Sequence, residues 1–127
     1  MIEILQIENN QEIFEFYKNI HIDFASDCGV MIAKERGEII GYCTFILTDK
    51  NITITHIHPS DDVYLADGIL RSALHIADFR GITSAFYSNT VDFNLLKMLN
   101  FIKDEENQTI KIEKLHESCS SCSNKTN

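Results

Sequence analysis

Residues 29–47, GVMIAKERGEIIGYCTFIL, constrain the fold more than any other segment of the chain. Two β-rich runs flank the turn Lys34-Glu35-Arg36-Gly37, in which Gly37 can take a positive φ, so the segment predicts a β-hairpin. A third run, NITITHIHP at 51–59, alternates between apolar and polar residues and is closed by Pro59. Three strands in succession predict an antiparallel meander.

Helical spacing and capping residues predict the other elements. Asn9 and Glu12 have the spacing of a capping box, which predicts a helix over about 10–25. A helix of about 17 residues is expected before Arg80-Gly81, and a short one over 91–100. Short strands are expected at 2–7 and 82–88, and a terminal hairpin over 101–115 with its loop at 104–107.

The resulting order is β, α, β, β, β, α, β, α, β, β. A helix between two strands implies a right-handed crossover to a parallel neighbour. We therefore expect an α/β (α+β) fold with a mixed, mostly antiparallel sheet flanked by helices. Residues 1–115 are expected to form a single domain, and residues 116–127 a flexible tail that contains cysteines.

The charge balance limits the classes of partner. Eleven basic and nineteen acidic residues give a net charge of −8, and no block of Lys or Arg interrupts it. Such a chain disfavours nucleic acid and anionic membranes. No segment approaches the roughly 20 apolar residues of a membrane helix, and the N-terminus has no basic leader. We expect a cytoplasmic protein with no nucleic-acid or membrane partner.

Two segments carry a resemblance to a known family. Residues 37–41, GEIIG, are similar to the second hairpin strand of the GCN5-related N-acetyltransferases (GNAT), and the order of elements over 1–115 resembles theirs. Asn89, a short helix and then Leu99-Asn100-Phe101 resemble a family segment that ends in Leu-Gly-Phe. Asn100 replaces the glycine, and Asn readily adopts the left-handed helix end. The resemblance implies acyl transfer from acetyl-CoA, or another acyl-CoA, to a small-molecule or protein amine.

The resemblance also implies a cofactor site in a splay between two parallel strands, with pyrophosphate on backbone N–H groups at a helix start. The family's phosphate loop aligns with residues 65–70, LADGIL, in which Leu65 and Leu70 depart from the pattern. The candidate cofactor contacts are Ile57, Ala66, Asp67, Gly68, Ile69, Leu70 and Asn89. Gly68 has a second interpretation, which is close packing of the helix on a strand.

Two carboxylates precede this loop. Asp61 and Asp62 follow Ser60, a good N-cap, so they are expected in the first turn of the helix, where they would compete with pyrophosphate. The alternative is a helix that begins near Asp67, with residues 60–66 in a longer loop whose amides still face the phosphates.

The family's catalytic positions are changed in this chain. The tyrosine that protonates the leaving thiolate corresponds to Leu96, and the carboxylate base to positions near Thr53 and Thr55. Nearby replacements are Tyr87 as acid and His56 or His58 as base. His56 and His58 are two residues apart on the strand, so we expect them to share one face with Ile54.

The tail offers His116, Cys119 and Cys122 as weak metal candidates, in the pattern HxxCxxC. A structural zinc site needs four ligands, so no metal is predicted. Three functions remain open: an acyltransferase, a non-catalytic GNAT-fold binding or interaction protein with a degenerate CoA site, and a thiol- or metal-responsive protein that works through its tail. Exposed strand edges also allow a homodimer.

Overall fold

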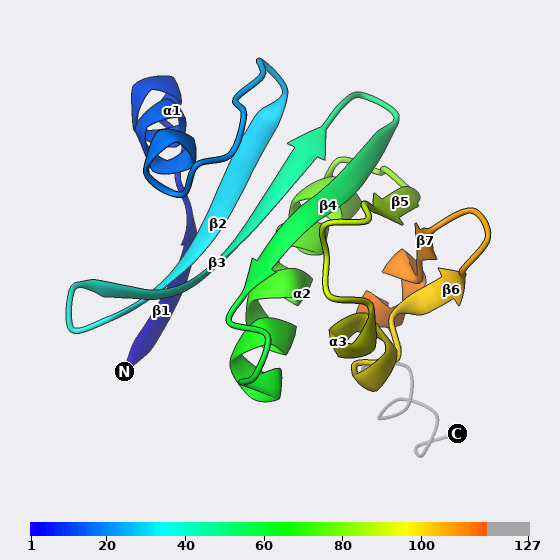
Figure 1. The fold of residues 1–127 in the computed structure, drawn as a ribbon. Coiled ribbons are helices and arrows are strands. Elements are labelled where there is room, and N and C mark those ends of the chain that lie inside the picture. Colours follow the sequence, from blue (N-terminus) through cyan, green and yellow to red (C-terminus); the bar gives the residue numbers. More distant parts are fainter. Residues whose placement is uncertain (117–127) are drawn as a thin grey trace.

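A computed structural model describes residues 1–116 as one mixed sheet with helices packed against it (Figure 1). The order of helices and strands is the predicted one, and the short 3₁₀ helix η1 follows the last strand. The elements are β1 (Ile2–Gln6), α1 (Asn10–Asn19), β2 (Cys28–Glu35), β3 (Glu38–Leu47), β4 (Asn51–His58), α2 (Val63–Phe79), β5 (Ser84–Tyr87), α3 (Phe93–Met98), β6 (Ile102–Asp104), β7 (Thr109–Ile110) and η1 (Ile112–His116).

The seven strands lie in the order β1-β2-β3-β4-β5-β7-β6. Within residues 1–116 the β4–β5 pair is the parallel one, and the other neighbouring pairs are antiparallel. Helix α2 connects the two parallel strands, as a crossover requires. The fold class predicted from the sequence is confirmed.

The two long helices cover opposite faces of the central strands. In β2, Met31 and Ala33 join the core beneath α2, while Val30 and Ile32 pack with α1. The buried hydroxyl of Tyr17 in α1 donates to the Gly29 carbonyl at 2.7 Å, which ties the helix to β2. This alternation along β2 is the period of two that the sequence pattern indicates.

Several element boundaries differ from the predictions. Helix α1 ends at Asn19 instead of near residue 25, because the chain leaves the helical conformation at His21, where φ is 60°. The last predicted strand ends at Ile110, and residues 112–116 form η1. The hairpin turn is as predicted, with Gly37 at φ 83°, and Asn100 takes the expected left-handed conformation at φ 61°.

Gly68 lies where α2 packs over β1. A Cβ atom built on Gly68 would be 3.2 Å from Cδ1 of Ile4, the flexible end of a side chain. Alanine is favoured over glycine by about 1 kcal/mol in a helix interior, so Gly68→Ala should stabilise the fold slightly or leave it unchanged. Urea unfolding followed by circular dichroism measures this. A loss of more than about 1 kcal/mol would contradict this expectation and show that close packing against Ile4 requires glycine.

β1 forms one edge of the sheet. The homodimer that exposed strand edges allow stays a prediction. Within residues 1–116, no helix combines the length and the apolar character needed to cross a bilayer. The domain boundary at residue 115 also stays a prediction, and residues 117–127 lie outside the described part of the chain.

Candidate functional site

The two parallel strands separate partway along the sheet. Their pairing covers residues 51–54 of β4 and ends with Ile54 opposite Tyr87, just before the Ser88 N–H donates to the Ile54 carbonyl at 2.9 Å. β4 continues to His58, whereas the chain beyond β5 turns toward α3 (Figure 1). The last part of β4 therefore has no strand partner on the side that β5 has left, and this gap in the strand pairing is called the opening below.

A β-bulge at Thr55 determines on which face of the sheet each side chain of β4 lies. The register between β3 and β4 shifts after Thr44, which lies opposite His56, so Thr55 is the extra residue. The shift reverses the alternation, and Ile54 and Ile57 both lie in the core beneath α2. The prediction that both histidines of β4 share a face with Ile54 is wrong; they lie on the opposite face, with Thr44.

The bulge also orients the backbone of Ile57. The Ile54 carbonyl bonds to β5, so Ile54 is a non-hydrogen-bonded position with respect to β3. Bonded and non-bonded positions alternate in an antiparallel pair, and the Thr55–His56 bulge occupies the bonded position that follows. Ile57 is then the next non-bonded position. Its N–H and C=O point away from β3, toward the opening, which keeps Ile57 as a candidate backbone contact.

His56 is held at the bulge by a threonine pair. The buried Thr44 Oγ1 lies 2.6 Å from Thr55 Oγ1 and 3.0 Å from Nδ1 of His56. Burial lowers the pKa of His56 below its usual value, so its neutral form is favoured. In the tautomer that donates from Nδ1 to Thr44, Nε2 keeps its lone pair and is the nitrogen available to take a proton.

His58 has a different environment on the same face. Its ring stacks on Tyr42, with centroids 5.3 Å apart and planes 23° from parallel, and Phe16 of α1 meets the ring of Tyr42 edge-on at 5.2 Å. His58 is exposed and lies at the end of β4. Of the two predicted base candidates, His56 is the one fixed by a buried polar partner.

The start of α2 holds a carboxylate where an anion would otherwise bind. Asp62 is the N-cap, and its Oδ1 accepts from the Leu65 N–H at 3.1 Å. The prediction that Ser60 is the cap, with Asp61 and Asp62 inside the first turn, is therefore wrong, and so is the alternative start near Asp67. The protein's own carboxylate satisfies a donor that pyrophosphate would need.

An open hollow of about 690 Å³ adjoins this helix start. Its lining combines apolar side chains with three carboxylates and contains no lysine or arginine: Glu35, Ile40, Pro59, Asp61, Asp62, Val63, Tyr64 and Leu65. Carboxylates near an entering diphosphate repel it, more strongly where water is partly excluded. This hollow therefore does not suit a diphosphate.

The other loop residues predicted to contact the cofactor lie inside α2. Ala66, Ile69 and Leu70 are fully buried, and Asp67 forms an ion pair with Arg71 at 2.9 Å. The Ala66 N–H donates to the Asp62 carbonyl, and later amides, including that of Gly68, donate within the helix. These amides are engaged within the helix, which argues against contact with a phosphate, and the cofactor contacts predicted at 66–70 stay a prediction.

Tyr87 and Asn89 lie together at the end of β5. Tyr87 is 6% exposed, and Asn89 Oδ1 accepts from Gln108 Nε2 at 2.8 Å. Burial raises the pKa of Tyr87, with a further contribution from Glu105 and Asp104. Leu96, at the family's tyrosine position, is fully buried in the core. The Asn89 side chain is thus engaged with the β6–β7 loop, and the Tyr87 hydroxyl stays protonated.

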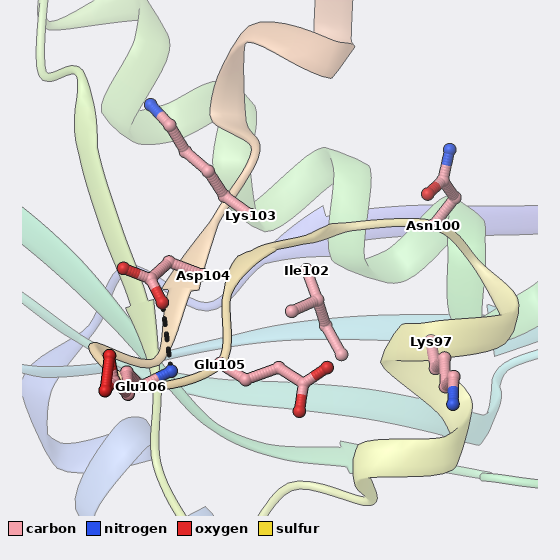
Figure 2. Close-up of a pocket in the computed structure, with 7 residues that line it drawn as sticks. All are labelled: Lys97, Asn100, Ile102, Lys103, Asp104, Glu105 and Glu106. Atoms are coloured by element: carbon pink, nitrogen blue, oxygen red, sulfur yellow. Dashed lines mark hydrogen bonds between the residues drawn. The ribbon is translucent and has the colours of Figure 1, made fainter.

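A second hollow, of about 490 Å³, lies beside the same loop (Figure 2). It is lined by Lys97, Asn100, Ile102, Lys103, Asp104, Glu105 and Glu106. In Figure 2 the Asp104 carboxylate caps the loop by accepting from the Glu106 N–H at 3.0 Å. The sequence predicts these acidic residues only as a loop.

The sequence analysis also did not identify Thr44 as a site residue. The signal that could have indicated it is a polar residue within an apolar strand segment.

The tail candidates are only partly within the described chain. His116 Nε2 lies 3.1 Å from Asp78 Oδ1 at the end of α2. Cys119 and Cys122 lie outside the described residues, and within residues 1–116 no group of three His, Cys, Asp or Glu side chains is placed to hold a metal. The metal- or thiol-responsive function stays a prediction.

Comparison with solved structures identifies the architecture. The ribosomal-protein-alanine N-acetyltransferase of Brucella melitensis biovar Abortus 2308 is similar with a TM-score of 0.61 and 12% identity, over 82% of this chain and 94% of that one. The ribosomal-protein-S18-alanine N-acetyltransferase of Escherichia coli gives 0.57 and 12%, over 86% and 88%. No family model and no curated protein sequence matches the chain.

A GNAT family acetyltransferase from Elizabethkingia anophelis, solved with acetyl-CoA bound, gives a TM-score of 0.55 and 13% identity, over 81% of this chain and 78% of that one. At these identities the likeness concerns the fold. This chain has the fold of the GCN5-related N-acetyltransferases.

Proposed function

We propose that this protein is an N-acyltransferase that transfers an acetyl or related acyl group from acyl-CoA to an amine. The observation that carries the proposal is the open edge of β4, where the Ile57 backbone faces the opening next to His56. A neighbour in fold was solved with acetyl-CoA bound, which supports the same class of donor here. Acyl-CoA would supply an activated acyl carbon on a thiol leaving group.

His56 and Tyr87 are the candidates for the proton transfers of this reaction. His56 Nε2 takes the proton that the attacking amine loses, and the lowered pKa of His56 keeps it ready as a base near neutral pH. Tyr87, held protonated, donates to the departing sulfur as the carbon–sulfur bond breaks. The Ile57 N–H positions the acyl arm by a backbone hydrogen bond.

The carboxylates at the α2 start are expected to limit donor affinity. Asp61→Asn with Asp62→Asn removes two negative charges and keeps the helix cap, because Asn and Asp cap equally well. Acetyl-CoA should then bind at least about tenfold more tightly, through loss of repulsion. Calorimetric titration of both proteins with acetyl-CoA measures the change.

The matched control carries Asp23→Asn and Asp49→Asn, which are the same substitutions at exposed positions outside the lining of this hollow. Equal gains in both double variants would assign the effect to overall charge instead of to the α2 start. If neither the wild type nor any variant releases heat with millimolar acetyl-CoA, the acyltransferase proposal fails.

The same hollow favours a second candidate, which is a GNAT-fold protein that binds a partner or ligand without catalysis. Its support is the joint presence of Asp62 at the helix cap, Glu35 across the hollow and Leu96 at the tyrosine position. Such a protein would transfer no acyl group to a panel of primary amines, whether or not acetyl-CoA binds to it. Transfer to any of these amines would rule out this candidate.

A further inference from the structure

Two threonine hydroxyls and one histidine nitrogen form a short hydrogen-bond network at the bulge. Thr44 Oγ1 lies 2.6 Å from Thr55 Oγ1 and 3.0 Å from Nδ1 of His56. Thr44 is fully buried, whereas Thr55 and His56 are partly exposed. Within residues 1–116 these two atoms are the hydrogen-bond partners of the Thr44 hydroxyl. The buried hydroxyl therefore joins the partly exposed Thr55 to the candidate base.

The single hydrogen of the Thr44 hydroxyl makes its two bonds run in one direction. At these distances each contact needs one hydrogen, and a threonine hydroxyl has one hydrogen to donate and two lone pairs that accept. Accepting from both partners would leave a buried hydroxyl hydrogen without an acceptor, which is costly. Thr44 therefore donates to one partner and accepts from the other.

Each direction of the network gives His56 a different tautomer. When Thr44 donates to Thr55, Nδ1 of His56 carries the ring hydrogen and donates to Thr44, so Nε2 keeps its lone pair. When Thr44 donates to His56, Nδ1 accepts and the ring hydrogen lies on Nε2. In the proposed reaction Nε2 takes a proton from the amine, which requires the first tautomer.

The first direction is the one that leaves no donor hydrogen unpaired. The Thr55 hydroxyl then gives its hydrogen to water, which its partial exposure allows. In the reverse direction the hydrogen on Nε2 needs an acceptor, and no residue within 1–116 forms a hydrogen bond with Nε2 of His56. Proteins leave an N–H without a partner more rarely than an acceptor. The contacts at the bulge thus favour the tautomer with a free Nε2.

We propose that Thr55, acting through Thr44, is a positioning residue that holds the proton of neutral His56 on Nδ1 and keeps Nε2 free as the base. This inference rests on the proposed function. The Thr55 oxygen is the acceptor that draws the Thr44 hydrogen away from Nδ1. When Nε2 takes the proton of the attacking amine, the Nδ1–H stays bonded to Thr44, so the network keeps its direction throughout the step.

Substitutions at Thr55 test the network in the resting protein, without any acyl donor. Thr55→Val removes the acceptor, so the Thr44 hydrogen can bond only to Nδ1, and the ring hydrogen of His56 should move to Nε2. Thr55→Ser keeps a hydroxyl and should keep the wild-type tautomer. Long-range nitrogen–proton NMR correlation spectra of the imidazole rings report the tautomer at about pH 8, where His56 is neutral. The His56 signals are those missing from His56→Asn.

Thr53→Val is the matched control. It is the same change on the same strand, at a side chain that takes no part in the network. This variant should keep the wild-type tautomer. A wild-type ring hydrogen mainly on Nε2, an unchanged tautomer in Thr55→Val, or an equal change in Thr53→Val would overturn the proposal.

Kinetics measure what the tautomer does to the reaction. Thr55→Val should lower kcat/KM for acyl transfer by about tenfold or more, and Thr55→Ser should restore it, because general-base catalysis needs the free Nε2. A reversed tautomer with unchanged kcat/KM would overturn the positioning role. Absence of acyl transfer in the wild type would refute the proposed function, whereas the NMR spectra decide the direction of the network without it, so the two failures are distinct.

Discussion

His56→Asn is expected to lower kcat/KM for acyl transfer by about a hundredfold or more, because general-base catalysis contributes on the order of 10² to 10⁴. Asparagine places a polar atom near the position of Nδ1, so the contact with Thr44 can persist while the basic nitrogen is lost. Steady-state kinetics with acetyl-CoA and the best amine acceptor measure the effect. An unchanged unfolding midpoint shows that the loss is chemical.

His58→Asn is the matched comparison on the same strand and face. It removes a ring that stacks on Tyr42, and it should change kcat/KM far less than His56→Asn. In the wild type, the acidic limb of the kcat/KM profile should have its midpoint below pH 6.5, because the lowered pKa keeps His56 unprotonated to lower pH. The opposite ranking of the two variants would make His58 the base.

Gly41→Ala is expected to destabilise the fold by about 2–3 kcal/mol. A Cβ atom at Gly41 would lie 2.8 Å from the His58 carbonyl oxygen and 3.1 Å from Cδ of Pro59. These atoms belong to the end of β4 and to the residue that follows it. A backbone carbonyl cannot move aside as easily as the end of a flexible side chain. Urea unfolding measures the cost.

Gly68→Ala serves as the control, because it is the same chemical change in the same protein. There the nearest atom is the flexible Cδ1 of Ile4 at 3.2 Å, and the expected effect has the opposite sign or is near zero. If both variants lose similar amounts of unfolding free energy, the close approach of the His58 backbone does not explain the glycine at position 41. A further loss of acetyl-CoA affinity in Gly41→Ala alone would tie the β3–β4 contact to the donor site.

The fold could be predicted because its signals are local. Alternation, caps and the Gly37 turn each act within a few residues, and they specified the β2–β3 hairpin, the crossover helix and the left-handed Asn100. Boundaries were less certain because tertiary contacts compete with helical propensity. Phe24, for example, packs edge-on against Tyr17 instead of extending α1.

The candidate site was predicted only in part, and the failures have one cause. A β-bulge leaves no pattern in a run such as NITITHIH, because the extra residue is defined by the partner strand and not by the run itself. The face of His56, the direction of the Ile57 backbone and the role of Thr44 all depend on that bulge. Similarly, the sequence predicts that Asp61 and Asp62 disfavour phosphate, but it does not predict that Asp62 is the N-cap of α2.

The sequence by itself determined the order of elements, the mixed sheet, the long helix after Pro59 and the acidic character of its start, because spacing and composition encode these features locally. Only the tertiary structure decided that His56 meets the buried Thr44 and that Tyr87 lies near Glu105. Those residues are far apart in the chain, and strand register and loop packing bring them together. No local sequence pattern determines that register, so only the paired strands define which side chains meet in this site.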